Sequence, residues 1–111
     1  MIACQVRMYL ASPTRLCLLE KTVSFHTVPR TGESLKFTNR KMGDYFAFRV
    51  GEVTHREGSA PELLLERWVK SSAEFEVLDE KELDEYVASY SAEGWRHEST
   101  VPNRDRERGA A

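Results

Sequence analysis

Residues 2–10 alternate strictly between apolar side chains and other side chains, and no other feature constrains the fold as strongly. The apolar positions are Ile2, Cys4, Val6, Met8 and Leu10. Successive side chains of a β-strand point to opposite faces, so this period of two indicates a strand with one buried face. Turn-forming residues follow at 11–14, and an apolar, β-branched stretch runs from 15 to 26. The chain therefore opens with a predicted β-hairpin.

The second strand of this hairpin is apolar on both of its faces. Leu16 and Leu18 belong to one face, whereas Cys17, Leu19, Val23 and Phe25 belong to the other. A bulge near Glu20 and Lys21 would explain this pattern, and so would a strand that is covered on both faces.

The two cysteines, Cys4 and Cys17, lie among aliphatic residues of the hairpin. In a register that pairs Leu10 with Arg15, they do not face each other across the two strands. The sequence therefore predicts two free, buried thiols, which suit a reducing compartment. Because no basic leader precedes a long apolar run, neither a secretory signal nor a membrane span is expected, and the predicted location is cytoplasmic.

Three more strands are predicted, at residues 35–38, 45–57 and 62–69. In the second of these, the inward-facing set changes parity between Val50 and Val53, with Gly51 between them. An interior glycine at such a change is typical of a β-bulge or a barrel corner.

The five strands are joined by short connections, which favour antiparallel neighbours. The predicted fold is mainly β, of the α+β class, with a five-stranded antiparallel, bulged sheet and one C-terminal helix. Such a sheet can close into a small SH3-like or OB-like barrel. A half-open sheet covered by the helix is the alternative.

The helix is predicted over about residues 79–93. Apolar residues recur at helical spacing, at Leu83, Tyr86, Val87 and Tyr90. Asp79 is placed to cap the N-terminus, and Glu82 is placed to complete a capping box. Gly94 is placed to end the helix in a left-handed conformation, with Trp95 folding back onto the last turn.

A chain of 111 residues is expected to form one domain. We place this domain at residues 1–100, with the sheet within 2–70. Residues 101–111 contain almost nothing apolar and are predicted to be a disordered tail.

No motif for catalysis, metal binding or cofactor binding is present in the sequence. The stretch PRTGES at 29–34 has one glycine and leads into a strand, so it predicts a turn rather than a phosphate loop. His26, His55 and His97 lack the short paired spacing of a zinc site, although His26 and His55 could meet, with Cys17, if their strands are neighbours. No nucleophile elbow occurs. We therefore predict no enzyme activity, no catalytic residue, no metal and no cofactor.

Charge is distributed unevenly along the chain, although the formal net charge is only −2. Residues 1–58 carry a net charge of +4, and residues 74–98 carry −7. Glu80, Asp84 and Glu85 therefore offer an acidic helix face to a basic protein partner, as inhibitor-type modules do. The favoured function is a non-catalytic protein-interaction module. Self-association through an uncovered edge strand is a further prediction.

Binding of single-stranded nucleic acid is the alternative function. Small β-barrels hold single strands by stacking bases on aromatic residues and by contacting phosphates with basic residues. Tyr45, Arg49 and Arg56 are the candidate residues, although the overall charge provides only a weak electrostatic attraction for nucleic acid.

Three stretches, VPRTGESLKF, YFAFRVGEVTHRE and ELLLERW, occur in an order that resembles small bacterial and phage β-barrel domains. In those domains a Pro-x-x-Gly-Glu turn precedes a short strand, an aromatic strand with Val and His, and an aliphatic strand. The similarity covers about residues 28–68. It implies a compact barrel of bacterial or phage origin, of a kind whose role is usually unassigned, and it carries over no catalytic residue.

Overall fold

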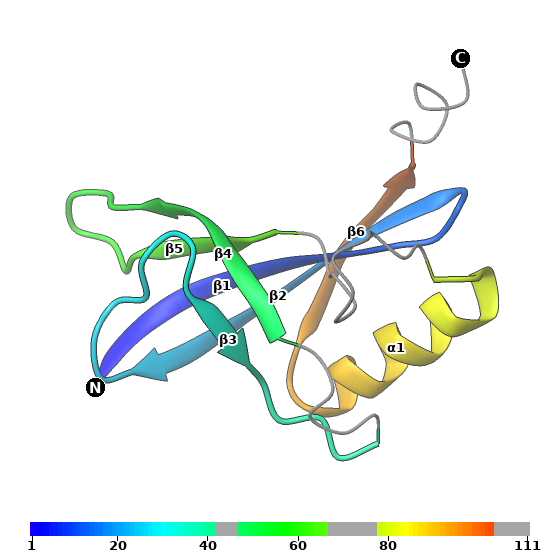
Figure 1. Cartoon of the computed structure of the whole chain (residues 1–111), viewed down its shortest axis with the longest axis horizontal. Helices are drawn as coiled ribbons and strands as arrows, with labels where there is room; N and C mark the ends of the chain where they lie inside the picture. Colours follow the sequence, from blue (N-terminus) through cyan, green and yellow to red (C-terminus); the bar gives the residue numbers. More distant parts are fainter. Residues whose placement is uncertain (42–46, 67–77, 104–111) are drawn as a thin grey trace.

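The computed structural model of the chain describes residues 1–41, 47–66 and 78–103. Within these residues, six strands form one mixed sheet, and a single helix covers part of one side (Figure 1). The strands are β1 (Ile2–Ala11), β2 (Arg15–Phe25), β3 (Ser34–Lys36), β4 (Ala47–Thr54), β5 (Glu62–Leu65) and β6 (Arg96–Pro102). The helix α1 (Glu80–Ala92) lies between β5 and β6 in the sequence. The predicted mainly β class is confirmed.

The strands follow the order β3-β4-β5-β1-β2-β6. All neighbours are antiparallel except β1 and β5, which are parallel. The predicted five-stranded antiparallel sheet is therefore matched only roughly, because the sheet has six strands and one parallel pair. The sheet is not closed into a barrel, which agrees better with the alternative of a half-open sheet covered by the helix. The difference arises at the connection 26–33. After it, β3 does not pair with β2, the strand that precedes it in the sequence. β6 takes that edge of β2 instead, and β5 takes the other edge of β1.

The first hairpin is tighter than the predicted register. Leu10 pairs with Cys17 rather than with Arg15. The Ser12 amide donates to the Arg15 carbonyl at 2.9 Å, which closes a short turn. The shift is two residues, so every side chain keeps its predicted face. Cys4 and Cys17 are buried and free, as predicted.

The predicted bulge at Gly51 is confirmed. Val50 pairs with Leu65 and Glu52 with Leu64, so Gly51 has no partner of its own. The extra residue brings both Val50 and Val53 toward the core despite their opposite parity.

The other predicted bulge, near Glu20 and Lys21, is absent from the pairing of β1 with β2, which runs without interruption. The irregularity lies instead between β2 and β6, where Leu18 pairs with Ser99 and Leu19 with His97. Glu98 is thus the extra residue. A bulge therefore does not explain why β2 has apolar residues on both of its faces. Leu16 and Leu18 lie on the outer face of the sheet, which is described below.

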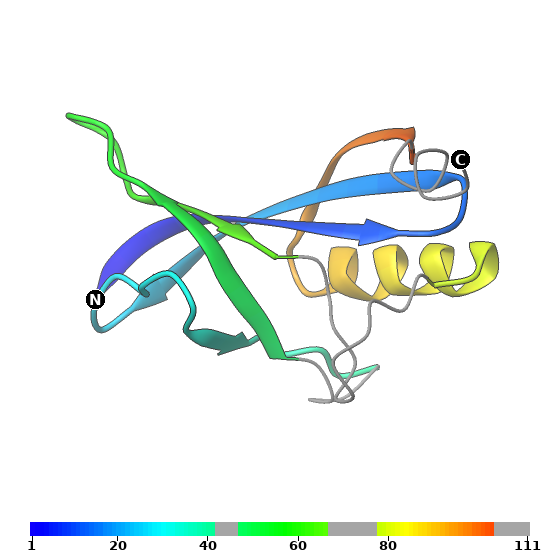
Figure 2. The ribbon, with the colours of Figure 1, turned by 45° about the horizontal axis from the view of Figure 1, so that its top comes forward.

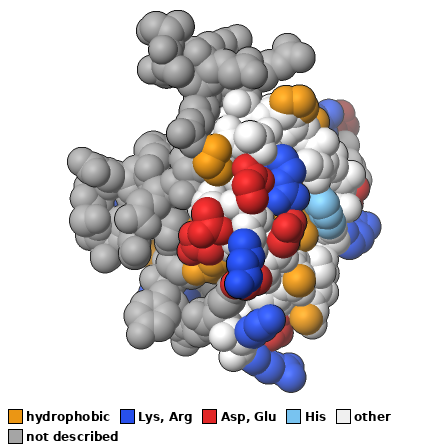
Figure 3. All heavy atoms as spheres, turned by 90° about the vertical axis from the view of Figure 1, so that its right-hand side faces the viewer, with side chains coloured by type: hydrophobic (Ala, Val, Ile, Leu, Met, Phe, Trp, Pro, Cys, Tyr) orange, Lys and Arg blue, Asp and Glu red, His pale blue; other side chains and the backbone are white. Residues whose placement is uncertain are grey.

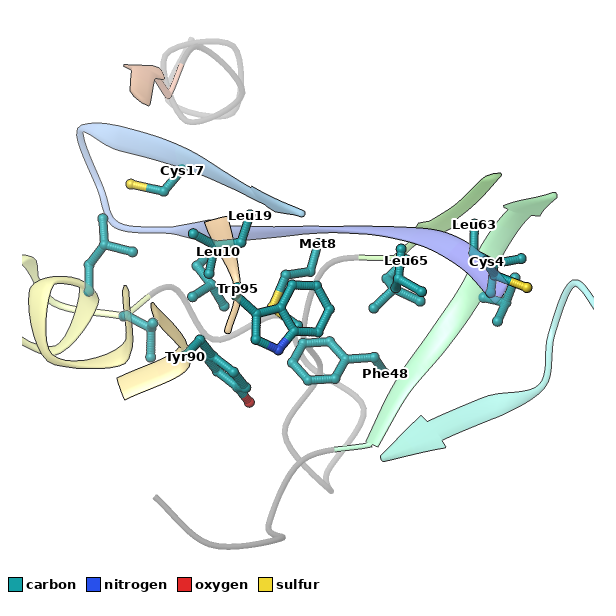
Figure 4. Packing of buried hydrophobic residues seen from close by; sticks show 14 residues of the cluster. Cys4, Met8, Leu10, Cys17, Leu19, Phe48, Leu63, Leu65, Tyr90 and Trp95 are labelled. Carbon is teal, nitrogen blue, oxygen red and sulfur yellow. The ribbon is translucent and has the colours of Figure 1, made fainter. Parts of the chain in front are cut away.

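The core lies on the face of the sheet that α1 partly covers, and it extends from α1 along β1 to β4 and β5 (Figure 4). The inward residues of β1 and β2 are joined there by Phe48 and Val50 of β4, Leu63 and Leu65 of β5, and Leu83 and Tyr90 of α1. Trp95 meets Tyr90 edge-on, with ring centroids 6.1 Å apart. Figure 2 shows α1 on one side of the strands β1 and β2.

Both ends of α1 follow the sequence signals. The Asp79 carboxylate accepts from the Glu82 amide at 2.7 Å, and the Glu82 side chain accepts from the Asp79 amide. At the other end Gly94 has a φ of 94°, and the Trp95 amide donates to the Tyr90 carbonyl at 3.1 Å. This is the predicted capping box and the predicted Schellman-type stop.

The folded part of the chain extends beyond the predicted boundary at residue 100. β6 continues to Pro102, and Asn103 is buried. The Asn103 amide donates to the Thr14 carbonyl at 3.0 Å, and its side-chain amide donates to the Ser12 carbonyl at 2.8 Å. These bonds anchor the end of β6 to the first hairpin. The rest of the predicted tail, 104–111, lies outside the described residues.

Candidate functional site

The acidic N-terminal turn of α1 is joined to the first hairpin by hydrogen bonds. The Glu80 carboxylate accepts from the hydroxyls of Ser12 at 2.8 Å and Thr14 at 2.7 Å, and from Arg15 Nε at 2.9 Å. Hydrogen bonds from the Thr14 hydroxyl first, and then from the Ser12 hydroxyl and the Arg15 guanidinium, lower the pKa of Glu80 from its ordinary value of 4.5 to about 2. Glu80 is therefore a structural carboxylate that fixes the helix to the sheet.

Asp84 takes part in the same network. Arg15 donates from one terminal nitrogen to the Asp84 carboxylate at 2.9 Å and from the other to the Glu80 carbonyl at 3.0 Å. These contacts with Asp84 and Glu80 raise the pKa of the Arg15 guanidinium above its ordinary value. Figure 3 shows acidic and basic side chains interleaved on this side of the molecule. The exposed face of α1 is thus less acidic than the sequence predicts, because Arg15 of β2 lies against Glu80 and Asp84.

Glu85, the third predicted partner-binding acid, is exposed and forms no ion pair within the described part of the chain. The structure therefore separates the three residues by role: Glu80 and Asp84 hold α1 in place, and Glu85 projects from it. Their contact with a basic partner stays a prediction.

The residues predicted to bind nucleic acid do not form one patch. Arg49 is exposed near the start of β4, and Arg56 is exposed just beyond its end. At about 3.3 Å per residue they are roughly 20 Å apart along the strand. Arg56 also pairs with Glu62 at 3.5 Å. Tyr45 lies outside the described residues, and nucleic-acid binding stays a prediction.

The turn at 29–34 uses its own polar groups. Gly32 has a φ of 91°, and its amide donates to the Val50 carbonyl at 2.8 Å. The Glu33 carboxylate accepts from the Arg30 amide, which is the donor that a bound anion would need. An open depression lies beside these residues, with Thr27 and Val28 on its wall. The geometry is that of the predicted turn, stabilised by an internal carboxylate.

His97 is linked to Cys17 through the Thr100 hydroxyl. Its Nε2 atom is 2.7 Å from the Thr100 hydroxyl, which is 3.4 Å from the Cys17 sulfur. His26 and His55 are exposed elsewhere. In the described ranges, no three His, Cys, Asp or Glu side chains gather closely enough to hold a metal ion.

A surface that the sequence did not single out lies on the sheet face opposite the core. Tyr9, Leu16 and Leu18 are half-buried there without belonging to the core cluster, and Val101 is 45% exposed. Tyr9 pairs with Leu18, and Leu16 pairs with both Ala11 and Val101. We call Tyr9, Leu16, Leu18 and Val101 the outer patch. Its sequence signal is the apolar character of β2 on both faces.

A row of ion pairs borders the outer patch. Glu20 accepts from Arg7 at 3.3 Å and from Arg96 at 3.2 Å, and Arg96 also contacts Glu98 at 3.3 Å. We call these four residues the ion row. The Glu20 side chain is only 14% exposed, because a guanidinium lies on each side of it.

Searches of protein-family models, of curated proteins and of solved structures returned no match to this chain. Among the described residues, no helix is both long and apolar enough to cross a membrane. The candidate function therefore depends on the surfaces described above.

Proposed function

We propose that this protein is a non-catalytic protein-binding module and that the outer patch is its contact surface. The observation that carries the proposal is a contiguous apolar surface on a sheet whose other face already forms the core. Contiguous apolar patches of this kind mark interaction sites. Tyr and Arg, which are enriched at protein interfaces, occur here as Tyr9 and, in the adjoining ion row, as Arg7 and Arg96.

The position of the patch favours a protein over a small molecule. Small-molecule sites are concave and enclose most of their ligand. The outer patch instead lies across three neighbouring strands, β1, β2 and β6. The depression described above is at the turn that contains Gly32, away from these strands.

Self-association through an edge strand is less favoured by the geometry. β6 is one edge of the sheet, and it carries a bulge at Glu98, a charge at Arg96 and a proline at its end. β3, the other edge, has three residues. Short edge strands, charges, bulges and prolines all oppose pairing with a second sheet.

A pull-down with matched variants tests the proposal. Leu18→Asp places a charge in the centre of the outer patch. Thr22→Asp places the same charge on the same strand and the same face, four residues away, and serves as the control. We expect wild type and Thr22→Asp to retain the same partner and Leu18→Asp to lose it, with all three folded by circular dichroism. Equal recovery by all three proteins would refute the proposal.

The exposed acids of α1 are a second candidate surface for a basic protein partner. The Asp84 side chain is 69% exposed even though it contacts Arg15, and Glu85 is exposed. The variant Glu85→Lys tests this surface without disturbing the Glu80 network. Loss of a partner from Glu85→Lys, with retention by Leu18→Asp, would favour α1 over the outer patch.

The nucleic-acid alternative has its own test. A labelled single-stranded oligonucleotide is titrated at low ionic strength against wild type and Arg49→Glu. Binding that weakens with added salt and with the substitution would support it. No binding at low salt would exclude it.

A further inference from the structure

The width of the outer patch is about the diameter of one α-helix. Neighbouring strands are about 4.8 Å apart, so the three strands that carry the patch span roughly 10 Å from β1 to β6. An α-helix with its side chains is about 10 Å across. On the opposite face, α1 already contacts the same three strands. A second helix on the outer patch would give these strands a cover on both faces, which is the usual way a sheet buries apolar surface.

The ion row indicates the charge of that helix. Both Glu20 carboxylate oxygens are occupied, one by Arg7 and one by Arg96. Arg96 is further neutralised by Glu98. Among the described residues, Arg7 donates from its Nε alone, and its side chain is 42% exposed. The row therefore presents unused guanidinium donors at Arg7, where a carboxylate of a partner can form a charge-assisted pair.

Among the described residues, the helix of a second copy, α1, is not free to play this part. Leu83 and Tyr90 of α1 are buried in the core of their own molecule, and Tyr86 and Val87 pack against that core. Packing two outer faces about a twofold axis along β2 would place Arg7 of one copy over Arg96 of the other. Like charges at that contact oppose association. Both points favour a different protein as the partner over a second copy.

We infer that the outer patch binds an amphipathic helix of another protein, with its apolar stripe on Tyr9, Leu16 and Leu18 and an acidic residue beside Arg7. This inference rests on the proposed function, which it makes specific. Helices of this kind lay an apolar face on a hydrophobic surface through residues spaced by three and four.

Three synthetic peptides of about 18 residues, roughly five helical turns, serve as probes. The first has a leucine stripe flanked by Glu, and the second has the same stripe flanked by Lys. The third has the composition of the first with its leucines scattered around the helix. Each is labelled and titrated by fluorescence anisotropy against wild type, Leu18→Asp, Arg7→Gln and Thr22→Asp.

We expect wild type and Thr22→Asp to bind the Glu-flanked peptide about tenfold more tightly than the Lys-flanked one, as one charge-assisted hydrogen bond allows. Arg7→Gln should remove this preference while keeping the binding of both. Leu18→Asp should lose both peptides, and the scattered peptide should not bind.

The outcomes separate the inference from the proposed function. Equal binding of the Glu-flanked and Lys-flanked peptides by wild type overturns the inferred acidic partner. Binding of the scattered peptide as tightly as the first, or no binding of any peptide, overturns the helical partner. In these cases the proposed function still stands if the pull-down partner is lost from Leu18→Asp alone. Peptide binding that is unchanged in Leu18→Asp overturns the inference, and an unchanged pull-down overturns the proposed function.

Discussion

The two faces of β2 differ although neighbouring residues build them. Leu19 is fully buried against α1, whereas Leu18, the preceding residue, is half-buried on the opposite face and outside the core. The chemistry of the two side chains is the same, so only the covering layer distinguishes them. We propose that an apolar strand face over which none of the described residues packs is available for another molecule, and this is the basis of the proposed function.

The largest expected effect tests this difference directly. Leu19→Ala should lower the free energy of unfolding by about 2–5 kcal/mol, because it leaves a cavity in a packed core. Leu18→Ala removes the same atoms from a half-exposed site and should cost less than about 1.5 kcal/mol. Urea unfolding of both variants measures the comparison.

Equal losses in the two variants would contradict the assignment of faces. A large loss for Leu18→Ala would mean that the outer patch is already covered within the folded chain, and it would then be unavailable to a partner. Binding to the Glu-flanked peptide should show the reverse order, with Leu18→Ala weakened more than Leu19→Ala at a temperature where both are folded.

The next effect concerns the attachment of α1 to the covered face. Glu80→Ala removes the acceptor for Ser12, Thr14 and Arg15. It should destabilise the protein less than Leu19→Ala and more than Glu85→Ala, which changes an exposed acid on the same helix. Thermal unfolding of the three variants gives the order, and a Glu80→Ala protein as stable as Glu85→Ala would contradict the role of Glu80.

This effect should depend on pH. The pKa of Glu80 is lowered to about 2 in the folded protein from an ordinary value of 4.5. A carboxyl with a lowered pKa stabilises the fold above its unfolded pKa, and this stabilisation is lost as the pH falls through the folded value. The difference in stability between wild type and Glu80→Ala should therefore be constant above about pH 5 and should shrink between pH 4.5 and 2.

The sequence predicted the strands and the helix that bury one face in the core. It did not predict β6, which buries no side chain. The alternation in β1, the glycine bulge in β4 and both caps of α1 each have a local residue signal, and the structure confirms them. β6 has no such signal, because its side chains are all exposed and an edge strand needs no apolar period. The parallel pairing of β1 with β5 also has no local signal, since it depends on which sheet edge remains free.

The candidate site, too, depends on contacts that no local sequence signal predicts. Charged residues such as Glu80 and Asp84 stand out in a sequence, yet here Arg15 engages both within the fold. The outer patch draws residues from β1, β2 and β6, so its contiguity depends on strand order. Only Leu16 and Leu18, on the unexpected face of β2, indicated it from the sequence.

A smaller effect is expected at the end of α1. Gly94 has a φ of 94°, and an added Cβ would meet only the Lys21 side chain at 3.6 Å, an ordinary contact. Gly94→Ala should therefore cost about 1 kcal/mol through the left-handed backbone alone. Gly94→Asn should cost less, because Asn tolerates that conformation. Chemical denaturation distinguishes the two, and peptide binding at the outer patch should be unchanged in both.

The smallest effect is expected in the ion row. Arg96→Ala removes an exposed partner of Glu20 and should cost roughly 0.2–1 kcal/mol, as exposed ion pairs do. Arg7→Ala alone should cost a similar amount, because Glu20 keeps Arg96. The double variant leaves Glu20, whose side chain is 14% exposed, without a cation. Its loss should therefore exceed the sum of the single losses in a double-mutant cycle. An additive result would show that water already screens Glu20, so that neither guanidinium is held in place for a partner's carboxylate.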